Sequence, residues 1–278
     1  MDPFVSAAWL AARSGDVRIA DVRWYLDGRS GRAAYEKGHI PGAVFIDLER
    51  WLAAPAIPDG GRHPLPDPEI FAEGMSRAGI GDAATVIAYD DAGGVIAARL
   101  AWMLRVLGHQ AAVLDGGIDS WEGELSSQVV EPSRATFTPA PWPGDRLATI
   151  EEACSPKHLV IDARDADRYR GESEPIDPRA GHIPGAHSLP CRGNLGPERR
   201  MLPIPELRRR FELIGVVQAE GVISYCGSGV TACHNLLVLE HAGFGIGRLY
   251  PGSWSEYSRR EDLPVATGDL AQARPRSS

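Results

Sequence analysis

The chain has 278 residues, of which 44% are hydrophobic and 24% charged, as in an ordinary globular protein. Its 29 Lys and Arg against 37 Asp and Glu give a net charge of -8, and no basic block stands out, which argues against nucleic acid or an anionic membrane as a partner. No apolar run approaches the roughly 18 residues that span a bilayer. The N-terminus lacks the basic start and apolar run of a secretory signal, so we expect a cytoplasmic protein.

The first half of the chain alternates short apolar strands with helical patterns. In order, these are a strand ending in Asp-x-Arg ("RIADVR", 18–23), the turn "GHIPGA" (38–43), a helix opening on Leu-Pro-x-Pro-Glu (65–80), a strand (85–91), a glycine turn with a long apolar helix (93–108), and "AAVLDGGIDSW" (111–121).

A proline-rich stretch, residues 126–148, follows with four prolines and little periodicity, which predicts an extended interdomain linker. The same six features then return in the same order, at 159–164, 181–186, 202–216, 221–226, 229–243 and 246–257, and "GHIPGA" is repeated letter for letter. Such a match indicates an internal duplication.

The repeat predicts two domains of one fold class. Near-continuous apolar strands between helices are typical of a mainly parallel sheet with helices on both faces, so each half is expected to be α/β. We expect residues 1–125 to form the first domain, 126–148 the linker and 149–278 the second domain.

The stretch "VISYCGSGVTACHN" puts a cysteine where a strand of such a sheet ends. Ligands bind beyond the carboxyl ends of strands in open α/β sheets. We expect a strand ending at Cys226, a turn over Gly227, Ser228, Gly229 and Val230, and a helix capped by Thr231. Backbone N–H groups of the turn and the helix N-terminus would favour a thiolate, so Cys226 is the candidate nucleophile.

The other three cysteines lack this setting. Cys233 falls on an apolar helix face and is expected in the core, and Cys154 and Cys191 carry no such motif. The four cysteines have no zinc-ligand spacing, so we expect free thiols and no bound metal.

The first half provides an internal control. It has "YDDAGG" where the second has "YCGSG", so Asp90 or Asp91 stands in place of the nucleophile, and residues 1–153 contain no cysteine. We therefore expect the first domain to be catalytically silent. Features kept in both copies are interpreted as scaffold, namely His39 and His182, and the pairs Asp21/Arg23 and Asp162/Arg164.

Arg170 and Arg179 lie in a stretch, 168–186, that differs between the copies. From composition alone they could form a bidentate clamp for a carboxylate or another small anion, or they could pair with nearby Glu172, Glu174 and Asp177.

With its duplicated "GHIPGA", lone loop cysteine and "CGSGVTA", the chain resembles the tandem-domain rhodanese sulfurtransferases over residues 4 to 260, most of all the 3-mercaptopyruvate branch. The resemblance implies that Cys226 takes sulfur from a small anionic donor as a persulfide and passes it to cyanide, a thiol or thioredoxin. It implies no metal or organic cofactor. It also favours Arg170 and Arg179 as donor-binding residues and suggests a proton relay through Ser228 and His39, with Asp27 a candidate acid.

The charge of the residues after Cys226 indicates which sulfur donor the protein prefers. Relatives that prefer thiosulfate carry basic residues after the cysteine, whereas Gly227, Ser228 and Gly229 are uncharged, which favours 3-mercaptopyruvate; thiosulfate is the alternative. A cysteine phosphatase would need Cys-x5-Arg, and that position is Ala232. A non-catalytic binding module would not need the intact second loop.

Overall fold

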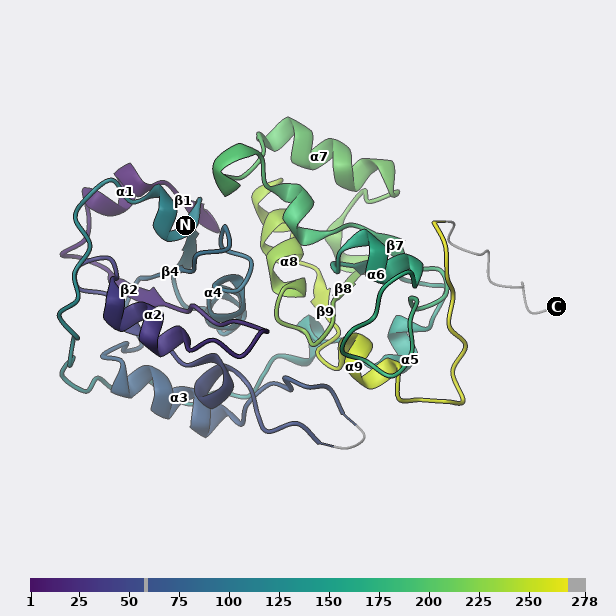
Figure 1. The fold of residues 1–278 in the computed structure, drawn as a ribbon, viewed down its shortest axis with the longest axis horizontal. Helices are drawn as coiled ribbons and strands as arrows, with labels where there is room; N and C mark the ends of the chain where they lie inside the picture. Colours follow the sequence, from purple (N-terminus) through teal and green to yellow (C-terminus); the bar gives the residue numbers. More distant parts are fainter. Residues whose placement is uncertain (58–59, 270–278) are drawn as a thin grey trace. The chain divides into compact units, whose positions relative to one another are not determined.

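The computed structural model describes residues 1–57 and 60–269, which fall into two compact units (Figure 1). Unit 1 comprises Met1–Ala54, Leu65–Pro143 and Leu195–Met201, and unit 2 comprises Pro55–Pro64, Gly144–Asn194 and the residues from Leu202 onward. Each unit therefore takes up one short segment from the opposite half of the sequence. This exchange is absent from the boundaries predicted above, because a segment of about ten residues carries no fold signal of its own.

Unit 1 contains a five-stranded sheet in the order β1-β5-β4-β2-β3, and all of its strand pairs are parallel. The strands are β1 (Phe4–Val5), β2 (Arg18–Asp21), β3 (Val44–Phe45), β4 (Val86–Tyr89) and β5 (Ala111–Leu114). Every residue of β4 and β5 is buried, as a sheet covered on both faces requires.

The helices of unit 1 are α1 (Ala7–Ala11), α2 (Gly31–Lys37), α3 (Pro68–Arg77) and α4 (Ala98–Val106), with a π-helix over Leu48–Leu52 and a 3-10 turn over Gly117–Ser120. One face of the sheet packs on Leu10 of α1 and on Ile118, and α4 runs against β4 and β5. The helix predicted at 65–80 begins at Pro68, because proline suits the first helical position, where its missing N–H has no intrahelical partner.

Unit 2 repeats the design with a four-stranded parallel sheet in the order β7-β6-β8-β9. Its strands are β6 (Leu159–Asp162), β7 (His187–Ser188), β8 (Val222–Tyr225) and β9 (Arg248–Leu249). The fold class predicted from the sequence, tandem α/β domains with parallel sheets, is confirmed in both units.

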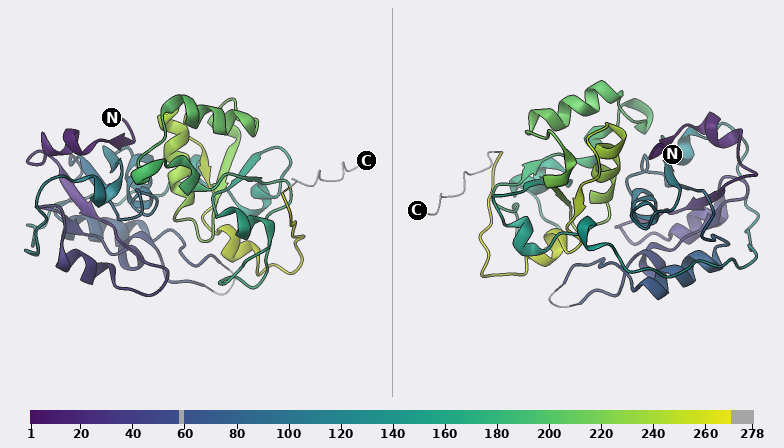
Figure 2. Two further views of the ribbon diagram at one scale, coloured as in Figure 1. Left: turned by 45° about the horizontal axis from the view of Figure 1, so that its top comes forward. Right: turned by 180° about the vertical axis from the view of Figure 1, so that it is seen from behind.

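The helices of unit 2 are α5 (Ile150–Ala153), α6 (Ala166–Arg170), α7 (Ile204–Leu213), α8 (Ala232–His241) and α9 (Ser253–Tyr257). Side chains of β6 and β8 on one face form a core with Ile150 of α5 and with Trp254 and Tyr257 of α9. On the opposite face, α8 lies along β8 and β9 and packs on α7, and these two helices stay side by side in every view (Figures 1 and 2).

The features kept in both copies serve as scaffold, as predicted. Asp21 and Arg23 form a buried ion pair at 2.6 Å, and Asp162 and Arg164 form the same pair at the same distance.

The two histidines of the repeated turn make equivalent contacts in the two units. His39 stacks on Tyr35 with ring centroids 3.9 Å apart, and its Nδ1 lies 2.8 Å from the Tyr35 carbonyl oxygen. His182 stacks on Tyr169 at 3.7 Å, with Nδ1 2.7 Å from the Tyr169 carbonyl oxygen.

The proline-rich stretch has no helix or strand between residues 127 and 143, but it is not a free linker. Up to Pro143 it belongs to unit 1. Phe137 is buried edge-on against Phe71, and the indole N–H of Trp142 donates to the Pro66 carbonyl at 2.7 Å. Phe137 is buried and Trp142 partly buried against unit 1, and this packing stabilises the position of the stretch. Composition alone did not reveal it.

Candidate active site

Cys226 directly follows β8, and its side chain is buried, with 2% of the residue exposed. The Gly229 N–H donates to Sγ at 3.2 Å, and Gly229 adopts φ +81°, a left-handed conformation that turns this N–H toward the sulfur. The loop ends at α8, which begins at Ala232 as predicted, although the Thr231 side chain makes no capping hydrogen bond. Val230, which precedes Thr231 in the loop, is buried.

Residues of α9 form hydrogen bonds with the backbone of Cys226 and Gly227. The backbone N–H groups of Trp254 and Ser255 donate to the carbonyls of Cys226 and Gly227 at 3.0 and 2.8 Å. The Cys226 N–H donates to the Ser253 hydroxyl at 3.2 Å. The carbonyls of Cys226 and Gly227 are thus engaged by α9, while the Gly229 N–H points to the sulfur, and such a donor favours a negative charge there.

Unit 1 shows what such a loop does when it lacks a cysteine. Asp90, fully buried, directly follows β4. Its carboxylate accepts four backbone N–H groups at 2.7–2.8 Å, from Ala92, Gly94, Ile96 and Ala97. The loop of unit 1 is therefore an anion cradle occupied by its own side chain. Asp91, the other candidate, accepts a hydrogen bond from the Tyr25 hydroxyl instead.

The other cysteines of unit 2 sit in different environments. Burial raises the pKa of the Cys191 thiol to about 12, so this cysteine stays protonated and is a poor nucleophile. Cys233 is fully buried on α8, with its thiol 3.4 Å from the Gly229 carbonyl, and its predicted core position is confirmed. Cys154 is half-buried.

His63 is a site residue that the sequence did not reveal. Its Nδ1 lies 2.7 Å from the Ser228 hydroxyl oxygen, and both side chains are buried. His63 arrives on the segment Pro55–Pro64, which belongs to unit 2 although it comes from the first half of the chain. One signal existed: with Leu65 matched to Leu202 in the repeat, His63 stands where the second copy has Arg200.

The relay suggested for His39 is not supported. Both ring nitrogens of His39 lie against carbonyl oxygens within unit 1, those of Tyr35 and Gln128. Asp27, the candidate acid, pairs with Arg29 at 2.8 Å and is exposed. The histidine that contacts Ser228 is His63, because the chain path and not the repeated turn decides which imidazole reaches the loop.

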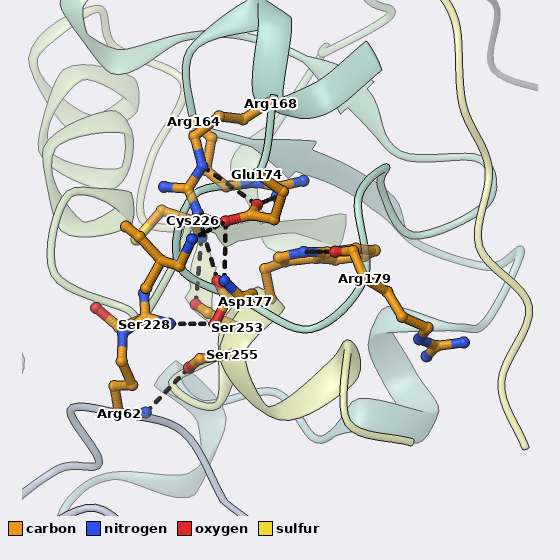
Figure 3. A network of polar contacts seen from close by, with 12 residues as sticks. Arg62, Arg164, Arg168, Glu174, Asp177, Arg179, Cys226, Ser228, Ser253 and Ser255 are labelled. Carbon is orange, nitrogen blue, oxygen red and sulfur yellow. Dashed lines mark hydrogen bonds and ion pairs between the residues drawn. The ribbon is translucent and has the colours of Figure 1, made fainter. Parts of the chain in front are cut away.

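A network of arginines and carboxylates lies beside the loop (Figure 3). Glu174 pairs with Arg164 at 3.1 Å and with Arg168 at 2.6 Å, and Asp177 pairs with Arg168 at 3.3 Å and with Arg62. Burial raises the pKa of the Asp177 carboxyl, and the Arg62 guanidinium acts in the opposite direction. A Cβ built on Gly227 would lie 3.2 Å from Arg62 Nη2 and 3.5 Å from Arg168 Nη1, so both guanidinium groups border the residue after the nucleophile.

The predicted clamp residues make other contacts. Arg170 pairs with Glu172 at 2.8 Å and Asp269 at 3.5 Å, which is the alternative considered from composition. The Arg179 guanidinium points away from Cys226 (Figure 3) and donates at 2.7–2.9 Å to four carbonyl oxygens, those of Tyr257, Ser258, Arg260 and Leu263. Tyr257 ends α9 and the other three residues follow it. The Tyr257 and Arg260 carbonyls also accept backbone N–H groups, so Arg179 adds further donors at this helix end. A donor-binding role for Arg170 and Arg179 stays a prediction that these contacts do not favour.

In the part of the chain that is described, no three His, Cys, Asp or Glu side chains gather closely enough to hold a metal ion. The same residues include no helix with the length and apolar character needed to cross a bilayer.

Comparison with known proteins finds the same family in both halves of the chain. The family model described as "Rhodanese-like domain" matches residues 6–124 and 146–260. A Pseudomonas aeruginosa protein named "Probable 3-mercaptopyruvate sulfurtransferase" is 42% identical over 95% of this chain and 98% of its own length. "Thiosulfate/3-mercaptopyruvate sulfurtransferase 1, mitochondrial" of Arabidopsis thaliana is 32% identical over 95% of this chain and 78% of its own. The solved 3-mercaptopyruvate sulfurtransferase from Leishmania major superposes with a TM-score of 0.85 at 31% identity, covering 95% of this chain and 76% of that one.

Proposed function

Because the chain belongs to the family of rhodanese-like domains, we propose that it is a sulfurtransferase that moves sulfur from 3-mercaptopyruvate, through a persulfide on Cys226, to a thiophilic acceptor. The observation that carries the proposal is the cysteine at the end of β8, buried in a loop whose Gly229 N–H donates to its sulfur. The names of the similar proteins, all sulfurtransferases, support the reaction class.

The first half-reaction forms one S–S bond and breaks one C–S bond. The Cys226 thiolate attacks the donor sulfur, and the electron pair of the C–S bond stays on carbon as the enolate of pyruvate. That carbon then needs one proton to become pyruvate. Ser228, hydrogen-bonded to His63, is the proposed proton source, because a hydroxyl paired with an imidazole is a common proton-transfer unit.

The second half-reaction returns the enzyme to its starting state. An acceptor attacks the outer sulfur of the persulfide, and the electron pair of the S–S bond returns to Cys226. Cyanide, a small thiol and thioredoxin are the proposed acceptors, and the cytoplasm is the proposed location. No step of this scheme requires a metal or an organic cofactor. Unit 1 is proposed to be silent, because Asp90 is a carboxylate and cannot carry sulfur.

The donor is tested by steady-state transfer to cyanide. We expect kcat/KM to be at least about tenfold higher for 3-mercaptopyruvate than for thiosulfate, a difference of ~1.4 kcal/mol in transition-state binding. Intact mass after each donor alone should show the gain of one sulfur atom. A preference for thiosulfate would keep the mechanism and replace the donor; the Arabidopsis relative, named for both donors, makes this the second candidate. No sulfur uptake from either donor would return the chain to a binding module.

The relay is tested with His63→Ala. We expect kcat with 3-mercaptopyruvate to fall about 100-fold, the usual scale of general acid catalysis. The rate with thiosulfate should change far less, because sulfite leaves as a stable anion and needs no proton on carbon.

His109→Ala, which alters a histidine of unit 1 that contacts the Asp82 carbonyl, serves as the matched control and should leave both rates unchanged. An equal loss with both donors in His63→Ala would contradict the relay and indicate that His63 only holds the loop.

A further inference from the structure

Arg62 is anchored to the nucleophile loop through its backbone. Its N–H donates to the Ser255 hydroxyl at 3.0 Å, and the Ser255 N–H in turn donates to the Gly227 carbonyl at 2.8 Å. The preceding Gly61 fits closely, since a Cβ there would lie 2.8 Å from the Gly252 carbonyl oxygen. Backbone contacts of Gly61 and Arg62 therefore fix where Arg62 lies next to the loop that carries Cys226, and its long side chain alone does not decide this.

Among the described residues, not every N–H donor of the Arg62 guanidinium has a hydrogen-bond acceptor. Nη1 pairs with Asp177, whose side chain is only 1% exposed. Nη2 borders Gly227, and Nε is buried with no hydrogen-bond partner among the described residues. A buried N–H without a partner costs free energy, and an oxyanion bound at this place would satisfy it.

Arg168 faces the same glycine and shares the same carboxylate. It pairs with Glu174 and with Asp177, so Asp177 bridges the two arginines and holds both guanidinium groups next to Gly227. Two adjacent guanidinium groups recognise a carboxylate or a sulfur oxyanion, because their planar forks match its oxygens.

We propose that Arg62, together with Arg168, binds the anionic head group of the sulfur donor. The uncharged loop then obtains its anion site from a segment of the first half of the chain, and Arg62 is the residue that selects anionic over neutral reagents at Cys226. This inference rests on the proposed function for the identity of the ligand, but the site itself is tested without any sulfur transfer.

The test measures alkylation of Cys226 by two reagents that differ in charge, iodoacetate and iodoacetamide. Second-order rates are followed by peptide mass analysis at Cys226. Arg62→Gln should slow iodoacetate about 10-fold or more, the scale of a lost charge-assisted hydrogen bond, and leave iodoacetamide unchanged. Arg168→Gln should do the same. Arg32→Gln, which removes an exposed arginine of unit 1 paired with Glu36, is the matched control and should alter neither rate.

Each outcome decides the proposal. If Arg62→Gln leaves the ratio of the two rates at its wild-type value, or lowers both rates equally, Arg62 is a structural ion-pair partner and the inference is overturned. Arg62→Lys, which keeps the charge and most of the volume, should retain part of the preference and guards against misfolding of the glutamine variant. A changed ratio in an enzyme that takes no sulfur from any donor would uphold the anion site and refute the proposed function.

Discussion

Replacing Cys226 with serine is expected to abolish sulfur transfer, with a loss of at least about 10⁴-fold in kcat, because the covalent carrier of the reaction is gone. A serine hydroxyl is a far weaker nucleophile than a thiolate and forms no stable persulfide analogue. The fold should remain intact, since Oγ is smaller than Sγ and still accepts the N–H of Gly229. Intact mass after incubation with 3-mercaptopyruvate should show no added sulfur.

Cys154→Ser is the matched control, because Cys154 is a half-buried cysteine of the same unit with no place in the loop. It should keep both the sulfur uptake and the rate of the wild type. Sulfur found on the Cys226→Ser protein would mean that another thiol carries the reaction, and the raised pKa of Cys191 makes that residue an unsuitable replacement.

The second large effect is expected on stability, from Asp162→Asn. Asp162 is fully buried and accepts from the Arg164 guanidinium at 2.6 Å, while Arg164 itself is almost fully buried. Removing Asp162 leaves the buried Arg164 charge with Glu174 alone as a carboxylate partner, so we expect a loss toward the lower end of the about 3–5 kcal/mol that breaking a buried ion pair costs. Chemical denaturation of the wild type and the variant measures the loss of free energy of unfolding.

The duplication supplies the control. Asp21→Asn breaks the equivalent pair with Arg23 in unit 1 and should cost at least as much, because among the described residues Asp21 is the carboxylate that pairs with Arg23. The two variants should differ in function. Arg164 also holds Glu174, which holds Arg168, so Asp162→Asn should raise KM for the donor, whereas Asp21→Asn should not. Unchanged stability in both variants would show that the pairs contribute nothing net, and equal KM values would separate Arg164 from the donor site.

Comparison of the two loops supports the proposal that unit 2 carries the reaction and unit 1 is silent. Both follow an inner strand of the sheet and direct backbone N–H toward the side chain that comes directly after it. In unit 1 the anion is the Asp90 carboxylate, which fills the cradle permanently. In unit 2 the same place holds the Cys226 sulfur, which receives the Gly229 N–H; in the proposed reaction it takes up and releases a second sulfur atom. The residue that directly follows the strand therefore differs in kind between the units, a buried carboxylate in unit 1 and a thiol in unit 2.

Several features of this protein follow from the sequence by itself. The duplication, the parallel α/β sheets, the loop with Cys226 and the scaffold role of the repeated histidines and Asp–Arg pairs all rest on local patterns. Such patterns survive folding because alternation, helical periodicity and turn residues act within a few positions of the chain. Comparison of the two copies also predicted that features present in both are structural, and the structure shows equivalent buried contacts for them in the two units.

Only the tertiary structure decided which distant side chains reach the loop. His63 contacts Ser228 across 165 positions of sequence, and Arg62 accompanies it on a segment that joins unit 2. Composition and the family resemblance also suggested Arg179, yet its side chain donates to carbonyls at the end of α9 and after it. The physical reason is that an arginine has many rotamers and five N–H donors, so it can reach any nearby cluster of carbonyl oxygens. The path of the chain between elements leaves no periodic trace in the sequence.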